Sequence, residues 1–229
     1  MKILSLDTAT EACSAALFID GEVIESYQVA PRRHATLIMP MIKMVMAEAG
    51  LAAAQLDALA FGRGPGSFTG VRIAVGIVQG LAFAANLPVM PISTLAAIAR
   101  GAMFEHGVSQ VAAAIDARMQ EVYWGAYRAA PDGGVVLIDR ERVCSPSLVT
   151  LADNGEWFGA GSGWAVYTRT LQHSLAVRCW WGDHYPRARD IALLGAQAYR
   201  RGEFVTVDRV IPVYLRDEVA QKVLPKRRK

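Results

Sequence analysis

Apolar and polar positions at the start of the chain follow the short period of strands. Lys2–Leu6 and Cys13–Ile19 are apolar runs, and Glu22–Val29 alternates between polar and apolar side chains. Asp20 and Gly21, between the second and third runs, form a dipeptide typical of tight hairpin turns. The pattern therefore predicts three consecutive antiparallel strands.

Beyond these strands the apolar positions change to helical spacing. This spacing predicts a helix over Ala35–Ala49 and a second, almost wholly apolar helix over Val71–Ala85. Short apolar runs predict strands over Ala58–Phe61 and near Val89, and a third helix is expected over Thr94–Phe104. The first half of the chain therefore reads βββαβαβα.

The same order of elements begins again in the second half. Runs at Val111–Ile115, Glu121–Tyr127 and Val135–Ile138 predict three strands, and strand–helix pairs continue to a last helix over Arg189–Arg201. The residues themselves do not repeat. An α/β fold with two lobes of βββαβαβα order is predicted, as in the actin, Hsp70 and sugar-kinase superfold.

The boundary between the two lobes is expected where His106 and Gly107 interrupt the pattern. The prediction assigns residues 1–106 to the first lobe and residues 107–229 to the second. In this prediction the final helix could pack back on the first lobe.

The segment Gly62–Gly70 contains four glycines and one proline, which excludes regular structure. Backbone N–H groups before a helix suit an anion. However, Val71 and Arg72 stand where a P-loop has Lys and Ser or Thr. We favour the alternative that Gly64, Gly66 and Gly70 let two helices approach closely.

Composition excludes several classes of protein. A hydrophobic share of 53% over 229 residues is enough for a large core, and the net charge is only +3. Whole-chain charge is therefore weak support for nucleic-acid binding, although residues 222–229 form a basic tail. Cys13, Cys144 and Cys179 lack a CxxC spacing, which favours a reducing cytosol over a disulfide framework or a zinc site.

One charge-free segment, Ile73–Ala99, requires a test for a membrane span. Pro88 and Pro91 interrupt it, whereas a spanning helix needs about 20 unbroken apolar residues. We therefore expect helix, strand and helix buried in a cytoplasmic protein.

Three positions test whether the two-lobed fold keeps its usual nucleotide site. The first hairpin has Ala9 and Glu11 where a kinase needs glycine, and the second hairpin offers only Arg118. A glycine turn at Gly161 is of the adenosine-side kind. Asp7, Arg118 and Gly161 are the candidate nucleotide contacts, and weak or absent ATP binding is expected because Glu11 repels phosphate.

Catalytic and metal-binding patterns are missing from the sequence. The histidines are His34, His106, His173 and His184. No two of them have the i, i+3 or i+4 spacing of paired helical ligands, and Ile38 follows His34 where a partner would stand. Ser67 does not lie in a GxSxG elbow. We predict no catalytic residue and no metal ligand, which opposes both an ATP-dependent kinase or ATPase and a metallopeptidase.

Five segments spread along nearly the whole chain carry a family resemblance. They are Ile3–Ser14, Gly62–Ile73, Ala114–Met119, Glu121–Trp124 and Pro212–Arg216. They resemble the TsaB family, also called YeaZ, of bacterial tRNA threonylcarbamoyladenosine (t6A) synthesis. Two positions depart from the family: Ala74 replaces a usual glycine, and Ala220–Val223 replaces an aromatic and basic run.

The resemblance implies a non-catalytic subunit with the actin/Hsp70-like (ASKHA) fold. Members of the family pair with the related TsaD subunit, which carries the metal and transfers threonylcarbamoyl to N6 of the tRNA adenosine beside the anticodon. The TsaE ATPase joins them. The resemblance therefore implies no cofactor on this chain, with ATP and metal on the partner subunits, contact with tRNA through the complex, a homodimer when alone and no membrane.

The family's dimer surface lies on the first two long helices, and their composition supplies a reason. The predicted interface residues are Leu37, Ile38, Met41, Ile42, Val45, Val71, Ile73, Val75, Val78 and Leu81. A helix apolar on every side needs cover on every side, and the sheet covers only one. The alternative is a helix deeply buried within one lobe. On the dimer hypothesis, Val78→Glu or Ile42→Glu should abolish pairing with TsaD and leave the monomer folded.

Overall fold

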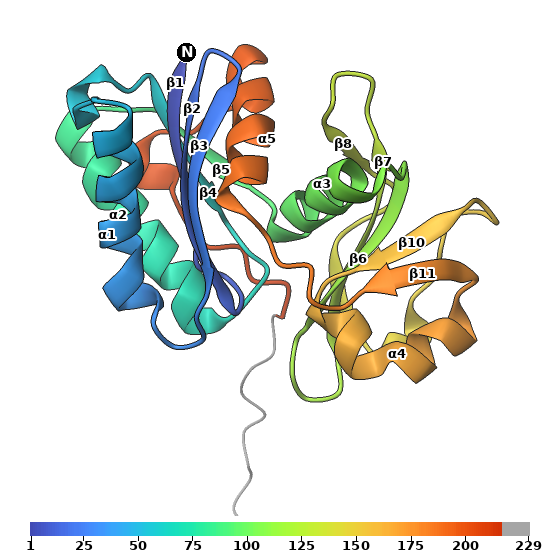
Figure 1. Cartoon of the computed structure of the whole chain (residues 1–229). Helices are drawn as coiled ribbons and strands as arrows, with labels where there is room; N and C mark the ends of the chain where they lie inside the picture. The colour runs from blue at the N-terminus through green and yellow to red at the C-terminus, as the bar shows by residue number, and fades with distance from the viewer. Residues whose placement is uncertain (217–229) are drawn as a thin grey trace, which may run out of the picture.

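A computed structural model of the chain describes residues 1–216 and shows two lobes, each built on a mixed sheet (Figure 1). The first sheet has the order β3-β2-β1-β4-β5. Its strands are β1 (Lys2–Asp7), β2 (Ala12–Ile19), β3 (Glu22–Val29), β4 (Ala58–Gly62) and β5 (Val89–Ile92). The hairpin strands β1, β2 and β3 pair antiparallel, and β4 and β5 add in parallel.

The second sheet repeats this plan, with the order β11-β10-β6-β7-β8 and β9 beside β7. Its strands are β6 (Gln110–Asp116), β7 (Val122–Ala129), β8 (Val135–Leu137), β9 (Arg142–Cys144), β10 (Trp157–Ala160) and β11 (Val177–Trp181). Antiparallel hairpins again come first, and β10 and β11 pair in parallel. The predicted three hairpin strands at the start of each lobe are therefore present.

Within residues 1–216, five α-helices cover the two sheets. They are α1 (His34–Glu48), α2 (Phe68–Ala85), α3 (Thr94–His106), α4 (Ser162–Ser174) and α5 (Ala188–Arg200), and 3-10 turns occur at Ala53–Gln55, Pro146–Leu148 and Val207–Arg209. The α2 helix begins three residues before the predicted start, because the Ser67 hydroxyl accepts a hydrogen bond from Gly70 N at 3.1 Å.

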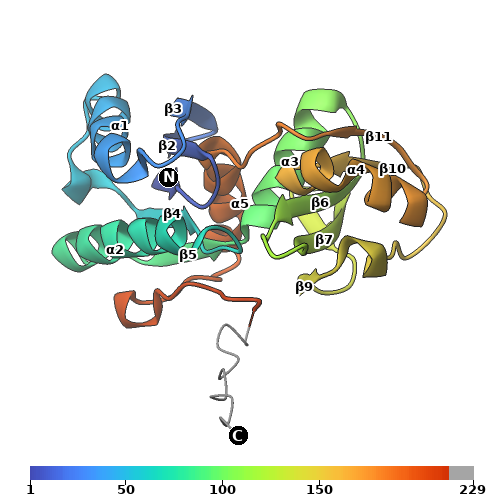
Figure 2. The same cartoon turned by 90° about the horizontal axis from the view of Figure 1, so that it is seen from below.

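Each of the two helices between the sheets packs on the sheet of the other half of the chain. The α3 helix packs on the second sheet, where Leu95, Ile98 and Ala102 join the same core as Val111. The α5 helix packs on the first sheet, beside Ile3. Figures 1 and 2 show both helices between the sheets, with α1 and α2 on the outer face of the first sheet. A cut at residue 106 therefore leaves α3 with the first sheet, which it follows in sequence, and separates it from the second sheet, which it covers.

After α5 the chain returns along the first lobe and reaches the second. Val205 pairs with Val89 at the edge of the first sheet, and Val210 is buried in the core under α2. Arg216 then contacts the second lobe, because its guanidinium lies 2.5 Å from the Glu121 carboxylate and 3.1 Å from Ala117 O. The last described segment therefore spans both lobes.

Candidate functional site

The glycine-rich loop between β4 and α2 packs against the turn that joins β1 to β2. Ser67 N donates a hydrogen bond to Ala9 O at 2.7 Å. Thr8 Oγ1 donates to Gly70 O, also at 2.7 Å. A Cβ added to Gly66 would lie 2.4 Å from Ala9 O, and one added to Gly70 would lie 2.0 Å from Thr8 O. Both glycines are needed because two backbone segments touch here.

Gly64 is the third glycine expected to shape a helix interface, and it has a φ of +100°. A Cβ added to Gly64 would lie 2.9 Å from Val213 O. All three positions therefore bring together backbone segments of this one chain, and they do not lie between α1 and α2. Through these contacts the loop fixes the start of α2 on the first lobe. The Gly70 N–H, which could have bound an anion, is used by the Ser67 cap.

Asp7 lies at the carboxyl end of β1 and is completely buried. Its Oδ1 accepts a hydrogen bond from Ala9 N at 2.9 Å, whereas its Oδ2 has no partner. Burial raises the pKa of the Asp7 carboxyl to about 7, although the Ala9 hydrogen bond opposes the change. A carboxyl that holds its proton near neutral pH is a poor magnesium ligand.

Arg118, the second nucleotide candidate, lies in the β6–β7 turn and is 77% exposed. Its guanidinium lies 2.8 Å from the Asp116 carboxylate and 3.8 Å from that of Glu11 in the opposite lobe. Two carboxylates therefore neutralise the positive charge of Arg118 that would otherwise attract a phosphate.

Gly161, the third candidate, begins α4 with a φ of +105°. A Cβ added there would lie 2.3 Å from Ala114 O on β6, and Gly161 N donates to Trp181 O at 3.0 Å. The position therefore needs glycine for packing against its own sheet. Asp7, Arg118 and Gly161 therefore do not form one nucleotide site with hydrogen-bond donors free to bind phosphate.

A hollow of about 750 Å³ lies elsewhere, between β5, α5 and the β8 hairpin, and none of the three nucleotide candidates lines it. The half-buried Arg63 and the buried Glu141 side chain lie in its wall, 3.8 Å apart. Tyr127 and Ser93 donate hydrogen bonds to the same Glu141 carboxylate. Burial and the Glu141 charge raise the pKa of the Tyr127 phenol well above its ordinary value. Tyr127, Ser93 and Glu141 are hydrogen-bonded to one another, and the Arg63 charge lies beside them although its Nε has no partner, so the wall is a structural contact between the lobes.

Most of the predicted interface residues on α1 and α2 face inward. The buried ones are Ile38, Met41, Ile42, Val45, Val71, Val75 and Val78, all in the first-lobe core. Leu37, Ile73 and Leu81 are only partly buried. The expectation that Val78→Glu or Ile42→Glu spares the fold is therefore wrong, because those side chains are 0% and 5% exposed. Sequence alone could not orient helices that are apolar nearly all round.

The opposite sides of α1 and α2 expose a second apolar set, which we name the α1–α2 face and which shares only Ile73 and Leu81 with the predicted interface. It consists of Met39, Met44, Phe68, Ile73, Gly76, Gly80, Leu81 and Phe83. Phe83 is 79% exposed, Phe68 63% and Met44 58%. Gly76, Gly80 and Phe83 share one side of α2, and nothing lies within 4 Å of a Cβ added to either glycine.

By length and composition α2 could also cross a membrane, with a mean hydropathy of 1.6 over 18 residues. The core helix of a globular lobe passes the same test. Val71, Val75 and Val78 pack in one cluster with Leu59 and Phe61 of the sheet, so α2 is an integral layer of the first lobe.

His34, which lacks a histidine partner at position 38, is buried at the start of α1. Its Nε2 lies 3.1 Å from Ala12 O, and Ile38 lies in the core. These contacts explain His34 as a structural residue.

Two features had no signal in the sequence. The segment 205–216 lies over α2, where Gln79 Nε2 donates to Val210 O at 2.8 Å and Tyr214 stacks on Phe68 with ring centroids 5.8 Å apart. His184 also meets the consecutive residues Glu105 and His106, although it is far from them in the chain. The departure at Ala220–Val223 and the basic tail lie outside the described residues.

Comparisons with known proteins identify the family. A model described as TsaD: tRNA N6-adenosine threonylcarbamoyltransferase matches residues 21–223. The tRNA threonylcarbamoyladenosine biosynthesis protein TsaB of Escherichia coli (strain K12) is 42% identical over 98% of this chain and 99% of its own length. The protein of the same name from Haemophilus influenzae is 43% identical over 99% of this chain and 98% of its own length.

Solved structures agree with this result. YeaZ from Pseudomonas aeruginosa is 46% identical, covers 93% of this chain and 99% of its own, and superposes with a TM-score of 0.90. Together with the two mixed sheets, the family match confirms the predicted two-lobed actin/Hsp70/sugar-kinase-like fold. The chain belongs to the TsaB (YeaZ) family, as its sequence motifs predict.

Proposed function

We propose that this chain is a non-catalytic subunit of the tRNA N6-adenosine threonylcarbamoyltransferase complex. Its near full-length similarity to proteins named for t6A biosynthesis supports the process. In this proposal it pairs with a TsaD-like catalytic subunit through the α1–α2 face. It also helps to recruit a TsaE-like ATPase, and it contacts tRNA through the complex in the cytoplasm.

The observation that carries the proposal is the composition of the α1–α2 face. Phe83 and Phe68 expose most of their side chains, and Gly76 and Gly80 leave the backbone of α2 open between them. A second helix could approach closely along the glycines and bury the aromatic rings. Exposed apolar area of this kind is typical of a surface that another protein covers.

Other features support a role without catalysis. Asp7, Arg118 and Gly161 each contact their own chain, and the His34 ring is bonded to the backbone. We therefore assign ATP and the catalytic metal to the partner subunits. When no partner is present, the same apolar face would let two copies of this chain form a homodimer.

Co-purification with a TsaD homologue tests the proposal. Met44→Glu and Phe83→Glu place charge on the α1–α2 face and should reduce recovery of the complex at least tenfold. Val166→Glu on α4 is the matched control, because Val166 is 57% exposed and Met44 58%. Normal complex formation by both face variants, measured by gel filtration, would rule out this interface.

Assay of t6A in tRNA separates the subunit role from the choice of interface. The complete mixture with TsaD and TsaE should form t6A only when this chain is added. Modification at the full rate without the chain would contradict the proposed function itself.

A further inference from the structure

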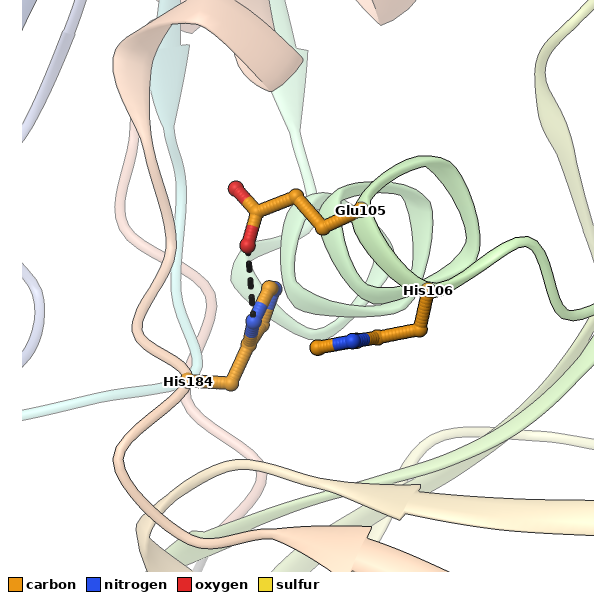
Figure 3. A group of neighbouring side chains, drawn as sticks. All are labelled: Glu105, His106 and His184. Atoms are coloured by element: carbon orange, nitrogen blue, oxygen red, sulfur yellow. Dashed lines mark ion pairs between the residues drawn. The ribbon is translucent and has the colours of Figure 1, made fainter.

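Three potential metal ligands meet where α3 ends (Figure 3). Glu105 and His106 are the last two residues of α3, and His184 comes from the segment that crosses from β11 to α5. One ligand atom from each residue lies within 4.8 Å of the other two. This site is separate from the α1–α2 face, since it lies between the lobes.

The distances suit a small divalent ion. His184 Nδ1 lies 3.6 Å from Glu105 Oε2, which is too long for a good hydrogen bond. Two ligands of one tetrahedral zinc, each about 2.0 to 2.1 Å from the metal, are separated by about 3.3 Å. The three ligand atoms lie within 4.8 Å of one another, so the exposed His106 side chain must move inward to complete such a set.

His184 gives a second, independent indication. Its side chain is 7% exposed, and its Nε2 has no hydrogen-bond partner. A neutral imidazole carries its proton on only one ring nitrogen. If Nε2 carries the proton, the Nδ1 lone pair faces the Glu105 carboxylate. If Nδ1 carries it, Nε2 is a buried acceptor without a donor.

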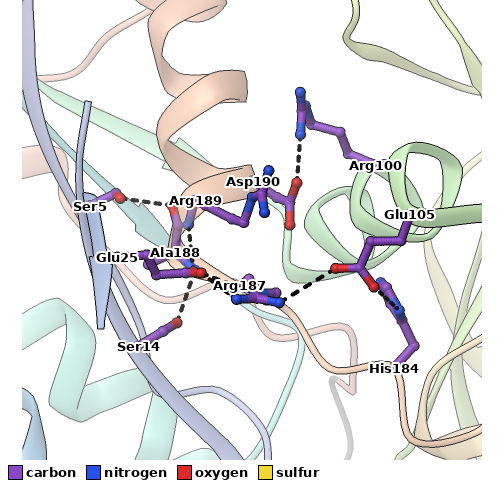
Figure 4. Close-up of polar contacts among 10 residues, drawn as sticks. All are labelled: Ser5, Ser14, Glu25, Arg100, Glu105, His184, Arg187, Ala188, Arg189 and Asp190. Atoms are coloured by element: carbon purple, nitrogen blue, oxygen red, sulfur yellow. Dashed lines mark hydrogen bonds and ion pairs between the residues drawn. The ribbon is translucent and has the colours of Figure 1, made fainter. Parts of the chain in front are cut away.

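Neighbouring residues orient two of the ligands, Glu105 and His184 (Figure 4). Arg187 Nη1 lies 3.5 Å from Glu105 Oε1, which leaves Oε2 directed at His184. The Arg187 charge is itself offset by Glu25, at 2.6 Å. His106 stacks on Trp181 with ring centroids 3.6 Å apart. Fixed partners around a ligand set reduce the cost of assembling it.

The surrounding backbone also favours a cation. Glu105 and His106 form the last turn of α3, where the helix dipole presents its negative end. Nε2 of His184 and Oδ2 of Asp190 lie on the same side of Gly101, 2.8 and 2.9 Å from a Cβ added there.

We propose that Glu105, His106 and His184 form a site for a divalent transition metal ion of the zinc class. Two imidazoles and one carboxylate are a ligand set that zinc accepts, with water as the fourth ligand. The ion would join α3, which covers the second sheet, to the crossover that leads to α5 on the first sheet. It would therefore restrict movement between the lobes.

Zinc titration of the full chain, purified without a histidine tag and treated with a chelator, tests the site. Calorimetry should give one ion per chain, and Co²⁺ should give the visible spectrum of a nitrogen- and oxygen-ligated site. The protein should carry Cys179→Ser, because Cys179 is an exposed thiol. His106→Ala and Glu105→Gln change exposed residues and should each weaken zinc binding at least tenfold.

His184→Ala should abolish binding, and circular dichroism establishes whether this buried variant still folds. His173→Ala is the matched control, since His173 is exposed on α4 and should leave the affinity unchanged. Absence of zinc binding by the parent protein would overturn the proposal. An unchanged affinity in both His106→Ala and Glu105→Gln would also overturn it, by placing the ion elsewhere.

Discussion

The Arg118 guanidinium of the second lobe lies 3.8 Å from the Glu11 carboxylate of the first. The two residues belong to the β6–β7 and β1–β2 turns, which hold phosphates in nucleotide-binding members of this superfold. Here an acidic and a basic side chain face each other across the same gap. Each lobe therefore supplies a charge that the other lobe offsets.

We expect the isolated chain to bind ATP with magnesium no more tightly than millimolar. Glu11 repels phosphate, and the Asp7 carboxyl at the base of the turn holds its proton near neutral pH. Calorimetry measures the affinity directly. Micromolar binding that Arg118→Ala removes would contradict this prediction and return Arg118 to the nucleotide site.

Replacing buried and exposed residues of α2 by glutamate should give opposite results. Val78 is 0% exposed, so Val78→Glu forces a charge into the core and should lower the free energy of unfolding by about 4 kcal/mol or more. Phe83 is 79% exposed, so Phe83→Glu should change it by no more than about 0.5 kcal/mol. Urea unfolding followed by circular dichroism distinguishes the two. Similar losses in both variants would show that the α1–α2 face is covered in the isolated chain.

This contrast shows how far local sequence patterns reach. The strands and the hairpin at Asp20 were predictable because alternation and turn residues act over a few positions. The inward side of α2 was not, because its apolar residues occupy nearly every side and only packing against Phe61 and its neighbours selects one.

Contacts between segments distant in the chain could not be predicted from local sequence patterns either. Nothing near Thr94–His106 specifies that α3 covers the second sheet, since that depends on how both sheets are placed. The meeting of His106 and His184 follows from the same placement. A search for helical ligand spacing cannot find a pair that the crossover between lobes brings together.

Asp7 should make the stability of the chain depend on pH. Burial raises its folded-state pKa from 3.8 to about 7, so the native state holds the proton more tightly than the unfolded chain does. The free energy of unfolding should therefore fall as pH rises from about 4 to 7, by up to about 4 kcal/mol, and change little above that. Urea midpoints at pH 5 and pH 8 measure the effect.

Asp7→Asn should remove this dependence, because the amide stays neutral and its Oδ1 can still accept from Ala9 N. The variant should gain stability over the parent at pH 8 and much less at pH 5. Asp139→Asn is the control, since the Asp139 side chain is 62% exposed. An equal gain for Asp7→Asn at both pH values would show that Asp7 is ionised throughout the folded range.

Gly161 and Gly202 form a matched pair that separates packing from nucleotide binding. Both have positive φ, +105° and +73°, so alanine strains the backbone at each. Only Gly161 is crowded, with an added Cβ 2.3 Å from Ala114 O, whereas nothing lies within 4 Å at Gly202. Gly202→Ala should therefore cost about 1 kcal/mol, and Gly161→Ala about 3 kcal/mol or more.

Thermal or urea unfolding of both variants decides between two roles for the α4 turn. If Gly161 served chiefly to admit an adenosine, its replacement would cost no more than that of Gly202. A much larger loss at Gly161 would mean that the turn is kept as glycine because α4 must start directly against β6. In that case the motif persists for the stability of the second lobe, and its presence in a sequence is not an argument for ATP binding.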